Sequence, residues 1–164
     1  MDRFTPQQRH RCMSHIRSKD TKPELMVRNW LWSHGYRYRL NVKNVPGKPD
    51  IVMRRYRTAI FVNGCFWHGH EDCKYYRIPK SNTEFWENKI NSNRQRDQKN
   101  YDILQQNGWQ VLVVWECQLV HENFENTMRY VDYMLNDKML SQYRNKAHVD
   151  ASKLKRQTKT KERL

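Results

Sequence analysis

The chain has no apolar segment long enough to cross a membrane and no apolar stretch near its beginning. Its longest uncharged apolar run, residues 109–115, is far shorter than the ~20 residues that a transmembrane helix needs. The first residues, MDRFTPQQRHR, lack the apolar centre of a secretory signal peptide. These two absences predict a soluble protein without a membrane partner, and they make the cytoplasm the expected location.

Acidic residues are also scarce. The 164 residues include 17 Asp and Glu against 31 Lys and Arg, which gives a net charge of +14 and a sequence pI of about 9.8. An excess of positive charge attracts polyanions, because neutralised phosphates release their counterions. We therefore expect a nucleic-acid partner, although an anionic membrane surface or a ribosome would respond to the same charge.

Length and composition favour one domain followed by a basic tail. A chain of this size has room for a single domain, and 37% of its residues are hydrophobic, which is enough for a modest core. We assign the domain to residues 1–143 and the tail to residues 144–164, which contain eight Lys or Arg and two acidic residues. The tail is expected to be flexible, either as a solvated end or as an arm that adds non-specific affinity for DNA.

Local signals predict two helices and a strand in the first part of the chain. Thr5 and Gln8 form a capping-box pattern with proline between them, which predicts a helix over residues 6–17. Thr21 and Glu24 repeat the pattern and predict the start of a second helix. The alternation of apolar and basic residues in YRYRL predicts a half-buried strand.

The rest of the chain predicts a mixed α/β fold. Residues 51–53 and 59–62 are predicted to form the two strands of an antiparallel hairpin, and residues 83–106 a long helix. The apolar run 109–115 predicts a buried strand, and a last helix follows it. A strand, a helix and a second strand in this order form a βαβ unit, whose two strands are parallel.

This topology brings chemically different residues to one edge of the sheet. The carboxyl ends of the two parallel strands share an edge, and Cys65 and Cys117 follow those ends directly. The pairing within the hairpin sets Asp50 beside Val62 and Asn63 at the same edge. We therefore predict that a carboxylate and two thiols lie close together there.

The segment NGCFWHGHEDC is rich in residues that bind metals. Zinc prefers four thiolate or imidazole ligands in a tetrahedron, and disulfides are uncommon inside cells. With Cys117 as a distant partner, the segment offers a Cys₃His set through Cys65, His70 and Cys73. The spacing does not settle whether His68 or His70 binds the metal. A surface histidine loop beside two core cysteines is the alternative.

The histidine that is not a ligand is a candidate for acid–base chemistry. Imidazole titrates near neutral pH, so His68 next to Asp50 is a candidate general base or acid. Asp97 lies on the long helix that crosses the sheet and is placed to orient the imidazole through a hydrogen bond. The alternatives are a solvent-facing or metal-binding histidine, and a solvated aspartate on the charged helix face NRQRDQK.

Two acidic residues suit a divalent cation. Asp50 follows Pro49 at the start of a strand, where its carboxylate is a suitable ligand for Mg²⁺. Glu24 has an evident capping role, and it is also placed to reach the water shell of that metal. A cation at this edge lowers the pKa of bound water and stabilises a pentacoordinate phosphate, as phosphodiester hydrolysis requires. Without this geometry, Pro-Asp is an ordinary turn pair.

Aromatic pairs flank the metal-rich loop. Phe66, Trp67 and Trp86 either pack beneath the loop or enter DNA, because apolar side chains unstack base pairs and mismatched steps open most easily. Phe85 is expected to pack beneath the loop. Four residues on the long helix are placed to contact phosphates: Lys89, Asn93, Arg94 and Arg96.

Five motifs in the order PGKPD, IFVNGCFWHGHEDC, SNTEFWENKI, NRQRD and GWQVLVVWEC resemble the very short patch repair (Vsr) mismatch endonucleases. The resemblance covers roughly residues 10–120. It implies a restriction-endonuclease-like fold of the PD-(D/E)xK superfamily, with a mixed β-sheet flanked by helices and a structural zinc site. It also implies a Mg²⁺-dependent endodeoxyribonuclease that nicks one strand on the 5′ side of the thymine in a T:G mismatch.

The same resemblance implies roles for particular residues. The Mg²⁺ ligands would be Asp50 and the main-chain carbonyl of Val62, and the catalytic group would be completed by His68, Asp97 and Glu24. The zinc ligands would be Cys65, His70, Cys73 and Cys117. The residues that contact DNA would be Met13, Phe66, Trp67, Trp86, Lys89 and Asn93.

The resemblance further implies a setting, and the sequence departs from the family in one place. We expect a monomer that acts on double-stranded DNA near the bacterial nucleoid, with a functional link to a cytosine-5 DNA methyltransferase and mismatch-repair proteins. Val62 and Asn63 stand where family members carry Thr and His, which preserves a carbonyl ligand but removes a second histidine. The alternatives are another PD-(D/E)xK nuclease that cuts intact duplex and a non-enzymatic, zinc-containing DNA-binding module.

Overall fold

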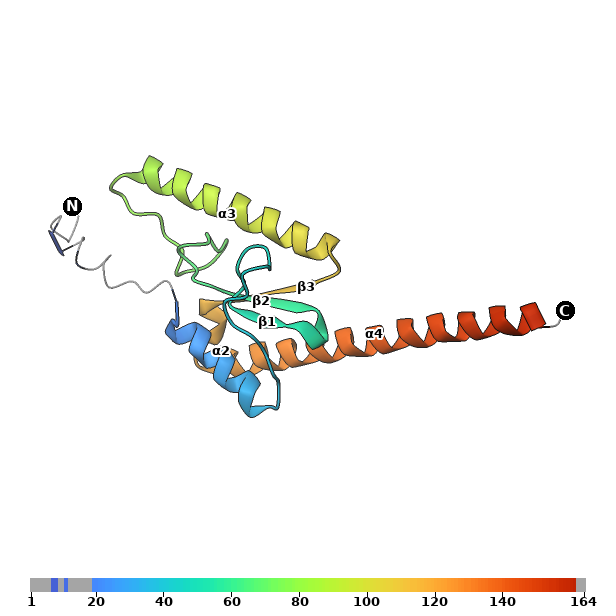
Figure 1. Ribbon diagram of the computed structural model, residues 1–164. Coiled ribbons are helices and arrows are strands. Elements are labelled where there is room, and N and C mark those ends of the chain that lie inside the picture. The colour runs from blue at the N-terminus through green and yellow to red at the C-terminus, as the bar shows by residue number, and fades with distance from the viewer. Residues whose placement is uncertain (1–6, 9–10, 12–18, 162–164) are drawn as a thin grey trace.

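The protein is described by a computed structural model, which covers residues 7–8, 11 and 19–161 (Figure 1). The predicted helix over residues 6–17 lies largely outside these residues. The elements follow in the order α2 (Lys22–Ser33), β1 (Ile51–Met53), η1 (Arg54–Tyr56), β2 (Thr58–Asn63), α3 (Thr83–Gln106), β3 (Gln110–Trp115), η2 (Glu116–Leu119) and α4 (Glu122–Lys161).

A small mixed sheet forms the centre of the described part of the chain. Its three strands lie in the order β1-β2-β3. β1 pairs antiparallel with β2, with Ile51 opposite Ile60, and β2 pairs parallel with β3, from Thr58 opposite Gln110 to Asn63 opposite Trp115. The predicted hairpin and the predicted parallel pair are both confirmed. The protein is therefore a mixed α/β protein with helices on both faces of a small sheet.

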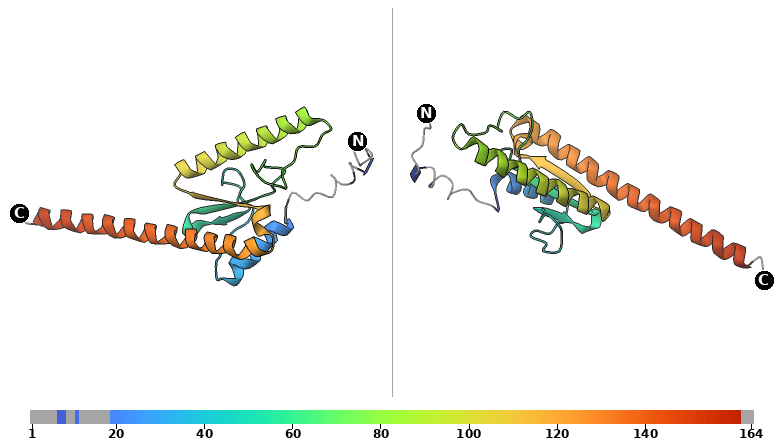
Figure 2. Two further views of the ribbon diagram at one scale, coloured as in Figure 1. Left: turned by 180° about the vertical axis from the view of Figure 1, so that it is seen from behind. Right: turned by 90° about the horizontal axis from the view of Figure 1, so that it is seen from above.

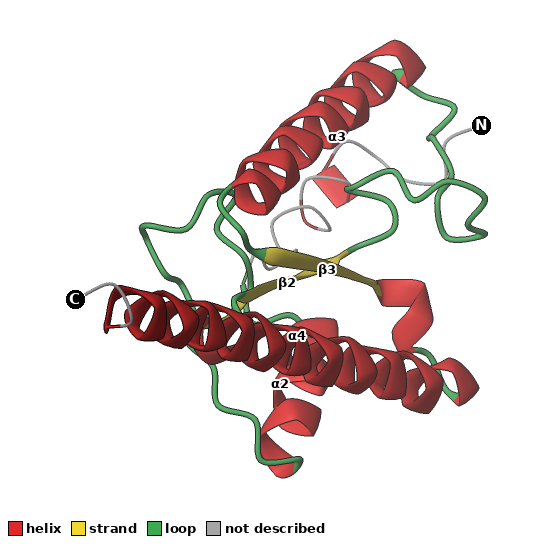
Figure 3. Cartoon of the chain, turned by 90° about the vertical axis from the view of Figure 1, so that its right-hand side faces the viewer, coloured by secondary structure: helices red, strands yellow, loops and turns green. Residues whose placement is uncertain are grey.

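The helices cover the two faces because β2 alternates its side chains between them. α3 lies on one face, and α2 and α4 lie on the other (Figures 1, 2 and 3). Ala59 and Phe61 pack in a cluster with Leu104 of α3. Ile60, from the opposite face of the same strand, packs in a larger cluster that contains residues of α2 and α4: Val27, Leu31, Met128, Val131 and Leu135.

The start of α2 follows its capping signal in the sequence, whereas the start of α3 does not. Thr21 caps α2, since its hydroxyl accepts a hydrogen bond from the Glu24 amide at 3.5 Å, as the sequence predicts. A helix capped by Thr83 would begin at residue 84, but α3 begins one residue earlier, directly after Asn82 in a left-handed conformation. Thr83 is therefore the first helical residue.

The prediction of a strand at YRYRL is wrong. Only Arg39 pairs with the sheet there, as an isolated antiparallel bridge to Val52. The flanking tyrosines tie the segment to helices instead: the Tyr36 hydroxyl binds Asp132 of α4, and the Tyr38 hydroxyl donates to the Arg28 carbonyl of α2. Asn41, with φ at +51°, then turns the chain away from the sheet.

α4 is much longer than the part that packs on the sheet. Met128, Val131 and Leu135 are buried against the core, whereas the C-terminal half extends away from the rest of the molecule (Figures 1 and 2). The structure therefore continues one helix through residues 144–161, where the sequence predicts a separate basic tail. Flexibility of that segment remains a prediction. None of the helices in the described residues is long and apolar enough to span a membrane.

Candidate active site and metal centre

A cleft of about 910 Å³ opens at the carboxyl edge of β2. It gathers five residues that the sequence predicts to be functional, each from a different part of the chain: Glu24, Asp50, Val62, His68 and Asp97. Asp50 precedes β1, Val62 lies near the end of β2, and His68 follows β2 on a loop that packs against α3. The predicted convergence at one edge of the sheet is therefore observed.

Asp50 carries a partly buried carboxyl group that is held by the neighbouring strand. The Val62 amide donates a hydrogen bond to the Asp50 Oδ2 atom at 2.7 Å. Burial raises the pKa of Asp50 to about 6, against the lowering effect of this hydrogen bond, and the nearby charge of Glu24 raises it further. A carboxylate that lines a cleft suits a hard cation such as Mg²⁺, whose charge would offset the cost of burying it.

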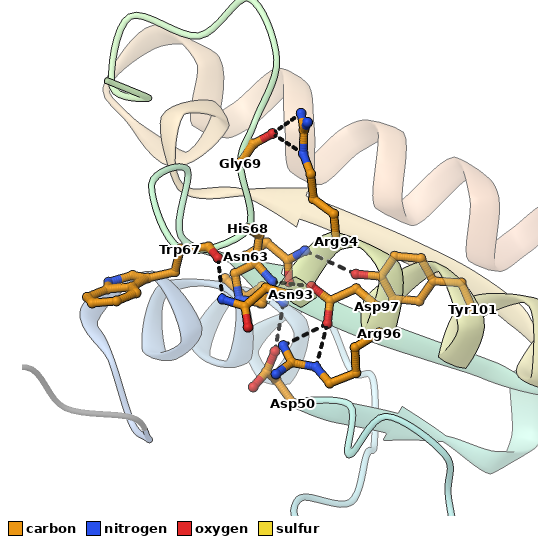
Figure 4. Close-up of polar contacts among 11 residues, drawn as sticks. Asp50, Asn63, Trp67, His68, Gly69, Asn93, Arg94, Arg96, Asp97 and Tyr101 are labelled. Carbon is orange, nitrogen blue, oxygen red and sulfur yellow. Dashed lines mark hydrogen bonds and ion pairs between the residues drawn. The ribbon is translucent and has the colours of Figure 1, made fainter. Parts of the chain in front are cut away.

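His68 and Asp97 form a tight pair in the same cleft (Figure 4). The His68 Nδ1 atom lies 2.5 Å from Asp97 Oδ2, and Arg96 donates to the other Asp97 oxygen at 2.9 Å. Such a carboxylate fixes the ring orientation and favours a proton on Nδ1. The Nε2 atom of His68 is then the ring nitrogen available to exchange a proton with a bound molecule.

Glu24 is held by structural contacts and also lines the cleft. It is only 5% exposed and binds Arg28 through a salt bridge of 2.8 Å. Its carboxylate also accepts hydrogen bonds from the Asp20 amide and the Thr21 hydroxyl. Glu24 nevertheless lines the cleft near Asp50, so a fixed, paired carboxylate faces the same space.

A second group of residues lies next to the cleft and is able to hold a metal ion. The ligand atoms of Cys65, His70, Cys73 and Cys117 all lie within 4.8 Å of one another. The His70 Nδ1 atom is 3.5 Å from the Cys65 sulfur and 3.3 Å from the Cys117 sulfur. The structure thus separates the two histidines: His70 joins the cysteines, and His68 joins Asp97.

The protonation of this group fits a cation with thiolate and imidazole ligands. Burial lowers the pKa of His70, which keeps the imidazole neutral, and its ring stacks on Trp115 at 4.1 Å. Burial also raises the pKa of the Cys65 thiol to about 12, which disfavours a thiolate without a neighbouring cation. Three sulfurs and one nitrogen at this spacing match a closed tetrahedral zinc site.

The aromatic residues form a small cluster beside the cleft. Phe66, Trp67 and Trp86 make edge contacts with ring separations of 5.1 to 5.9 Å. Phe85 contacts Trp86 but is 60% exposed, so the expectation that it packs beneath the loop is wrong. Its position in the first turn of α3 explains this, because the helix turns Ile90 rather than Phe85 into the core. Met13 lies outside the described residues.

The loop after β2 is held on α3 by hydrogen bonds to the carbonyl groups of two loop residues. The Asn93 amide donates to the Trp67 carbonyl at 2.9 Å, and the Arg94 Nε atom donates to the Gly69 carbonyl at 2.9 Å (Figure 4). Asn93 is 8% exposed and Lys89 is exposed, so of these two predicted phosphate contacts only Lys89 is freely accessible. Arg94 also binds Glu71.

One pair in this region is missing from the sequence analysis. The Asn63 amide nitrogen donates to the Tyr101 hydroxyl at 3.0 Å. The Tyr101 hydroxyl needs a hydrogen-bond partner when the side chain is buried, but the sequence does not show which residue supplies it. The spacing of four residues between Asp97 and Tyr101 is the signal that sets both on one helix face.

The fold and the cleft define a mixed α/β protein with a histidine–carboxylate pair beside a further carboxyl group, and these are residue types that hydrolytic enzymes use. Comparison with known proteins gives a more specific assignment. The family described as DNA mismatch endonuclease Vsr matches residues 1–75.

Curated relatives match a longer part of the chain. Type II nicking enzyme V.NmeAIP of Neisseria meningitidis serogroup A is 52% identical over 118 residues, which cover 72% of this chain and 84% of the relative. Type II nicking enzyme V.XorIIP of Xanthomonas oryzae is 49% identical, with 72% and 86% covered. The DNA mismatch endonuclease Vsr of Escherichia coli K12 is 41% identical, with 68% and 70% covered. The chain belongs to the Vsr family of DNA mismatch endonucleases.

Proposed function

We propose that the protein is a Mg²⁺-dependent endonuclease that nicks one DNA strand on the 5′ side of the thymine in a T:G mismatch, as a step of very short patch repair. The observation that carries the proposal is the His68–Asp97 pair beside Asp50 in one cleft of a Vsr-family protein. The excess positive charge of the chain supports a DNA substrate. Family membership favours an enzyme over a binding module.

The reaction is hydrolysis of one phosphodiester bond. The Nε2 atom of His68 takes a proton from a water molecule, and the water oxygen attacks the phosphorus atom. The bond between phosphorus and the leaving oxygen breaks, and the leaving oxygen takes a proton from solvent. Asp97 holds the ring during attack and stabilises the imidazolium that forms, because it binds Nδ1 at 2.5 Å.

Two metals complete the proposal. Asp50 and the carbonyl of Val62 would hold Mg²⁺, with Glu24 near its water shell, and this cation would offset the negative charge on the reacting phosphate. Cys65, His70, Cys73 and Cys117 would hold Zn²⁺ in a closed structural site. Such a site ties the loop after β2 to the end of β3 and so fixes the position of His68.

The aromatic cluster is the proposed element that recognises the mismatch. Phe66, Trp67 and Trp86 touch one another at the base of the loop that carries His68. We assign them to a wedge that enters the duplex beside the T:G pair, with the Met13 side chain entering from the other groove. Lys89 would contact phosphates, and Asn93 would support the wedge through its hydrogen bond to Trp67. A mismatched step costs least to unstack, so a wedge favours mismatched DNA.

A strand-specific nicking assay tests the function. The substrates are duplexes that differ at one position, with T:G, T:A or C:G, each labelled on either strand and incubated with and without Mg²⁺. We expect one nick, next to the mismatched thymine, only with Mg²⁺ and only in the T:G duplex. Binding without a Mg²⁺-dependent nick in any duplex would contradict the proposal.

Site-specific nicking of intact duplex is a second candidate. It is favoured by the names of the relatives V.NmeAIP and V.XorIIP, which are called type II nicking enzymes. On the same substrates, this candidate predicts equal nicking of T:A and T:G duplexes that share one flanking sequence. The restriction-endonuclease-like PD-(D/E)xK fold is part of both candidates.

The proposed substrate suggests functional partners and a cellular location. T:G mismatches arise where 5-methylcytosine is deaminated, so we propose a functional link to a cytosine-5 DNA methyltransferase and to mismatch-repair proteins, at the nucleoid in the cytoplasm. We also propose that the protein acts as a monomer. The basic segment 144–164 would add non-specific affinity for DNA, and a stronger salt dependence of binding for the full chain than for a chain ending at residue 143 would test this.

A further inference from the structure

One polar contact at the cleft has no role in the proposed chemistry. The Asn63 amide nitrogen donates to the Tyr101 hydroxyl at 3.0 Å, and Asn63 is only 4% exposed (Figure 4). Asn63 is the last residue of β2 and lines the cleft together with His68 and Asp97. The pair thus lies directly beside the groups that are proposed to activate water.

Strand and helix periodicity explain why these two residues meet. Phe61 and Asn63 point to the same face of β2, the face that α3 covers. On α3, Asp97 and Tyr101 lie one turn apart on the side that faces the sheet. The Phe61 ring packs on the Tyr101 ring at 4.9 Å, so the ring is held by Phe61 and the hydroxyl by Asn63.

The pair occupies a layer where apolar residues would pack without a desolvation cost. Ile90 and Leu104, at the two ends of the same helix face, are fully buried. Burying an amide and a phenol there costs free energy unless both groups are hydrogen-bonded. Their mutual hydrogen bond removes part of that cost, and it also fixes the orientation of the amide.

The fixed amide leaves one hydrogen-bonding atom for the cleft. The Asn63 side chain has two polar atoms, and its nitrogen is bound to Tyr101. Its Oδ1 atom has no hydrogen-bond partner among the described residues. Burial raises the pKa of Tyr101 to about 12, and the charges of Asp97 and Asp50 add to this. The hydroxyl therefore stays protonated and neutral, which makes it a fixed dipole and not a base.

We infer that the Asn63–Tyr101 pair positions the water molecule that His68 activates. This inference rests on the proposed function. Asn63 Oδ1 accepts a hydrogen bond from the water, while the second hydrogen of that water faces the Nε2 atom of His68. Tyr101 is a positioning residue that acts through Asn63, because its hydroxyl holds the amide in the orientation that turns Oδ1 to the cleft.

Single-turnover and steady-state nicking of the T:G duplex test the inference. We expect Tyr101→Phe to lower kcat about tenfold and Asn63→Ala to lower it about 30-fold or more, with KM for DNA unchanged. The double variant is expected to be no slower than Asn63→Ala, since Tyr101 acts only through the amide. A merely structural role would not produce this non-additive loss in kcat.

A matched control separates catalysis from stability. Tyr36 is also a partly buried tyrosine whose hydroxyl binds a polar partner, Asp132 of α4, on the other face of the sheet from α3. Tyr36→Phe is expected to lower the melting temperature at least as much as Tyr101→Phe but to leave kcat unchanged. Thermal melts of all variants verify folding.

Different results would contradict the proposed function and the inference about the Asn63–Tyr101 pair. If the wild-type protein nicks the T:G duplex and Tyr101→Phe retains its kcat, or if the two substitutions act additively, the inference is overturned and the proposed function stands. If the wild-type protein nicks no duplex, the proposed function fails, and the inference fails with it. A rise in KM alone would also overturn the inference, because it would place the pair in DNA binding.

Discussion

Two neighbouring sites at the same edge of the sheet differ in how their charges are balanced. The Cys/His cluster brings four ligand atoms within 4.8 Å of one another, which would complete a tetrahedral shell around one metal ion without any other group. The cleft next to it holds Asp50, Glu24 and Asp97 around an open space of about 910 Å³. The first site would be closed once a metal ion is bound, and the second is open and acidic.

This difference separates stability from chemistry. A saturated metal site has no free position for a substrate, so the contribution of the Cys/His cluster would be to fix the loop that carries His68. The open acidic site costs folding free energy at neutral pH, as the raised pKa of Asp50 indicates, and a bound cation would offset that cost. Substitutions in the two sites should therefore separate activity from stability.

The largest expected effect is on activity, from Asp50→Ala. We expect at least a 1,000-fold loss of nicking, about 4 kcal/mol of transition-state stabilisation, because the proposed Mg²⁺ ligand is removed. Thermal stability without added Mg²⁺ should not fall. The measurement is single-turnover nicking of a T:G duplex over a range of Mg²⁺ concentrations, and nicking close to the wild-type rate would show that Asp50 is not a metal ligand.

The opposite pattern is expected for Cys73→Ser. Loss of one ligand from the closed cluster should lower the free energy of unfolding by about 3 kcal/mol and the melting temperature by about 10 °C. Zinc content by mass spectrometry should fall from one ion per chain to a substoichiometric value. Lys74→Ser, next in the chain and outside the cluster, is the control, and a Cys73→Ser protein with full zinc content and stability would rule out this ligand set.

An intermediate effect on activity is expected for Asp97→Asn. The substitution preserves size but removes the charge that stabilises protonated His68, so nicking should slow by about 100-fold. DNA affinity without Mg²⁺ should stay the same. The measured quantities are the single-turnover rate and the dissociation constant, and a pure loss of affinity would place Asp97 in DNA binding instead.

The smallest effect is a gain in stability from Asp50→Asn at high pH. The pKa of Asp50 is raised from 3.8 to about 6 in the folded protein, so its carboxyl group favours folding below pH 3.8, and this contribution is lost as pH rises through 6. At pH 8 the asparagine variant should be more stable by about 1 to 2 kcal/mol without added Mg²⁺, and the difference should narrow toward pH 4. Denaturant melts at both pH values measure this, and equal stability at pH 8 would show that the charge of Asp50 carries no such cost.

Much of the site is predictable because it follows from strand topology. A hairpin and a βαβ unit set Asp50, Val62, Cys65 and Cys117 at one edge, and the paired register confirms that arrangement. Identifying which histidine joins the cysteines required coordinates, because His68 and His70 are two residues apart and either is able to reach the cluster in an extended loop. The same holds for Asn63 and Tyr101, whose contact depends on how α3 is rotated over the sheet.

Two predictions from the sequence are wrong because they depend on tertiary contacts that a local pattern does not show. YRYRL has the alternation of a strand, but the competing contacts of Tyr36 and Tyr38 with helices limit its pairing to one bridge. Phe85 is apolar and lies next to a residue of the aromatic cluster, yet its place in the first turn of α3 leaves it exposed. Local pattern does not encode which face of an element finds a partner.

The amino-acid sequence by itself determined most of the elements, their order, the shared edge of the parallel strands and the basic character of the molecule, because periodicity, capping and charge act over short distances. Only the tertiary structure decided which side chains become partners across that edge: His68 with Asp97, His70 with three cysteines, and Asn63 with Tyr101. These pairings depend on the packing of α3 and the loop against the sheet, which is set by contacts between residues far apart in the chain.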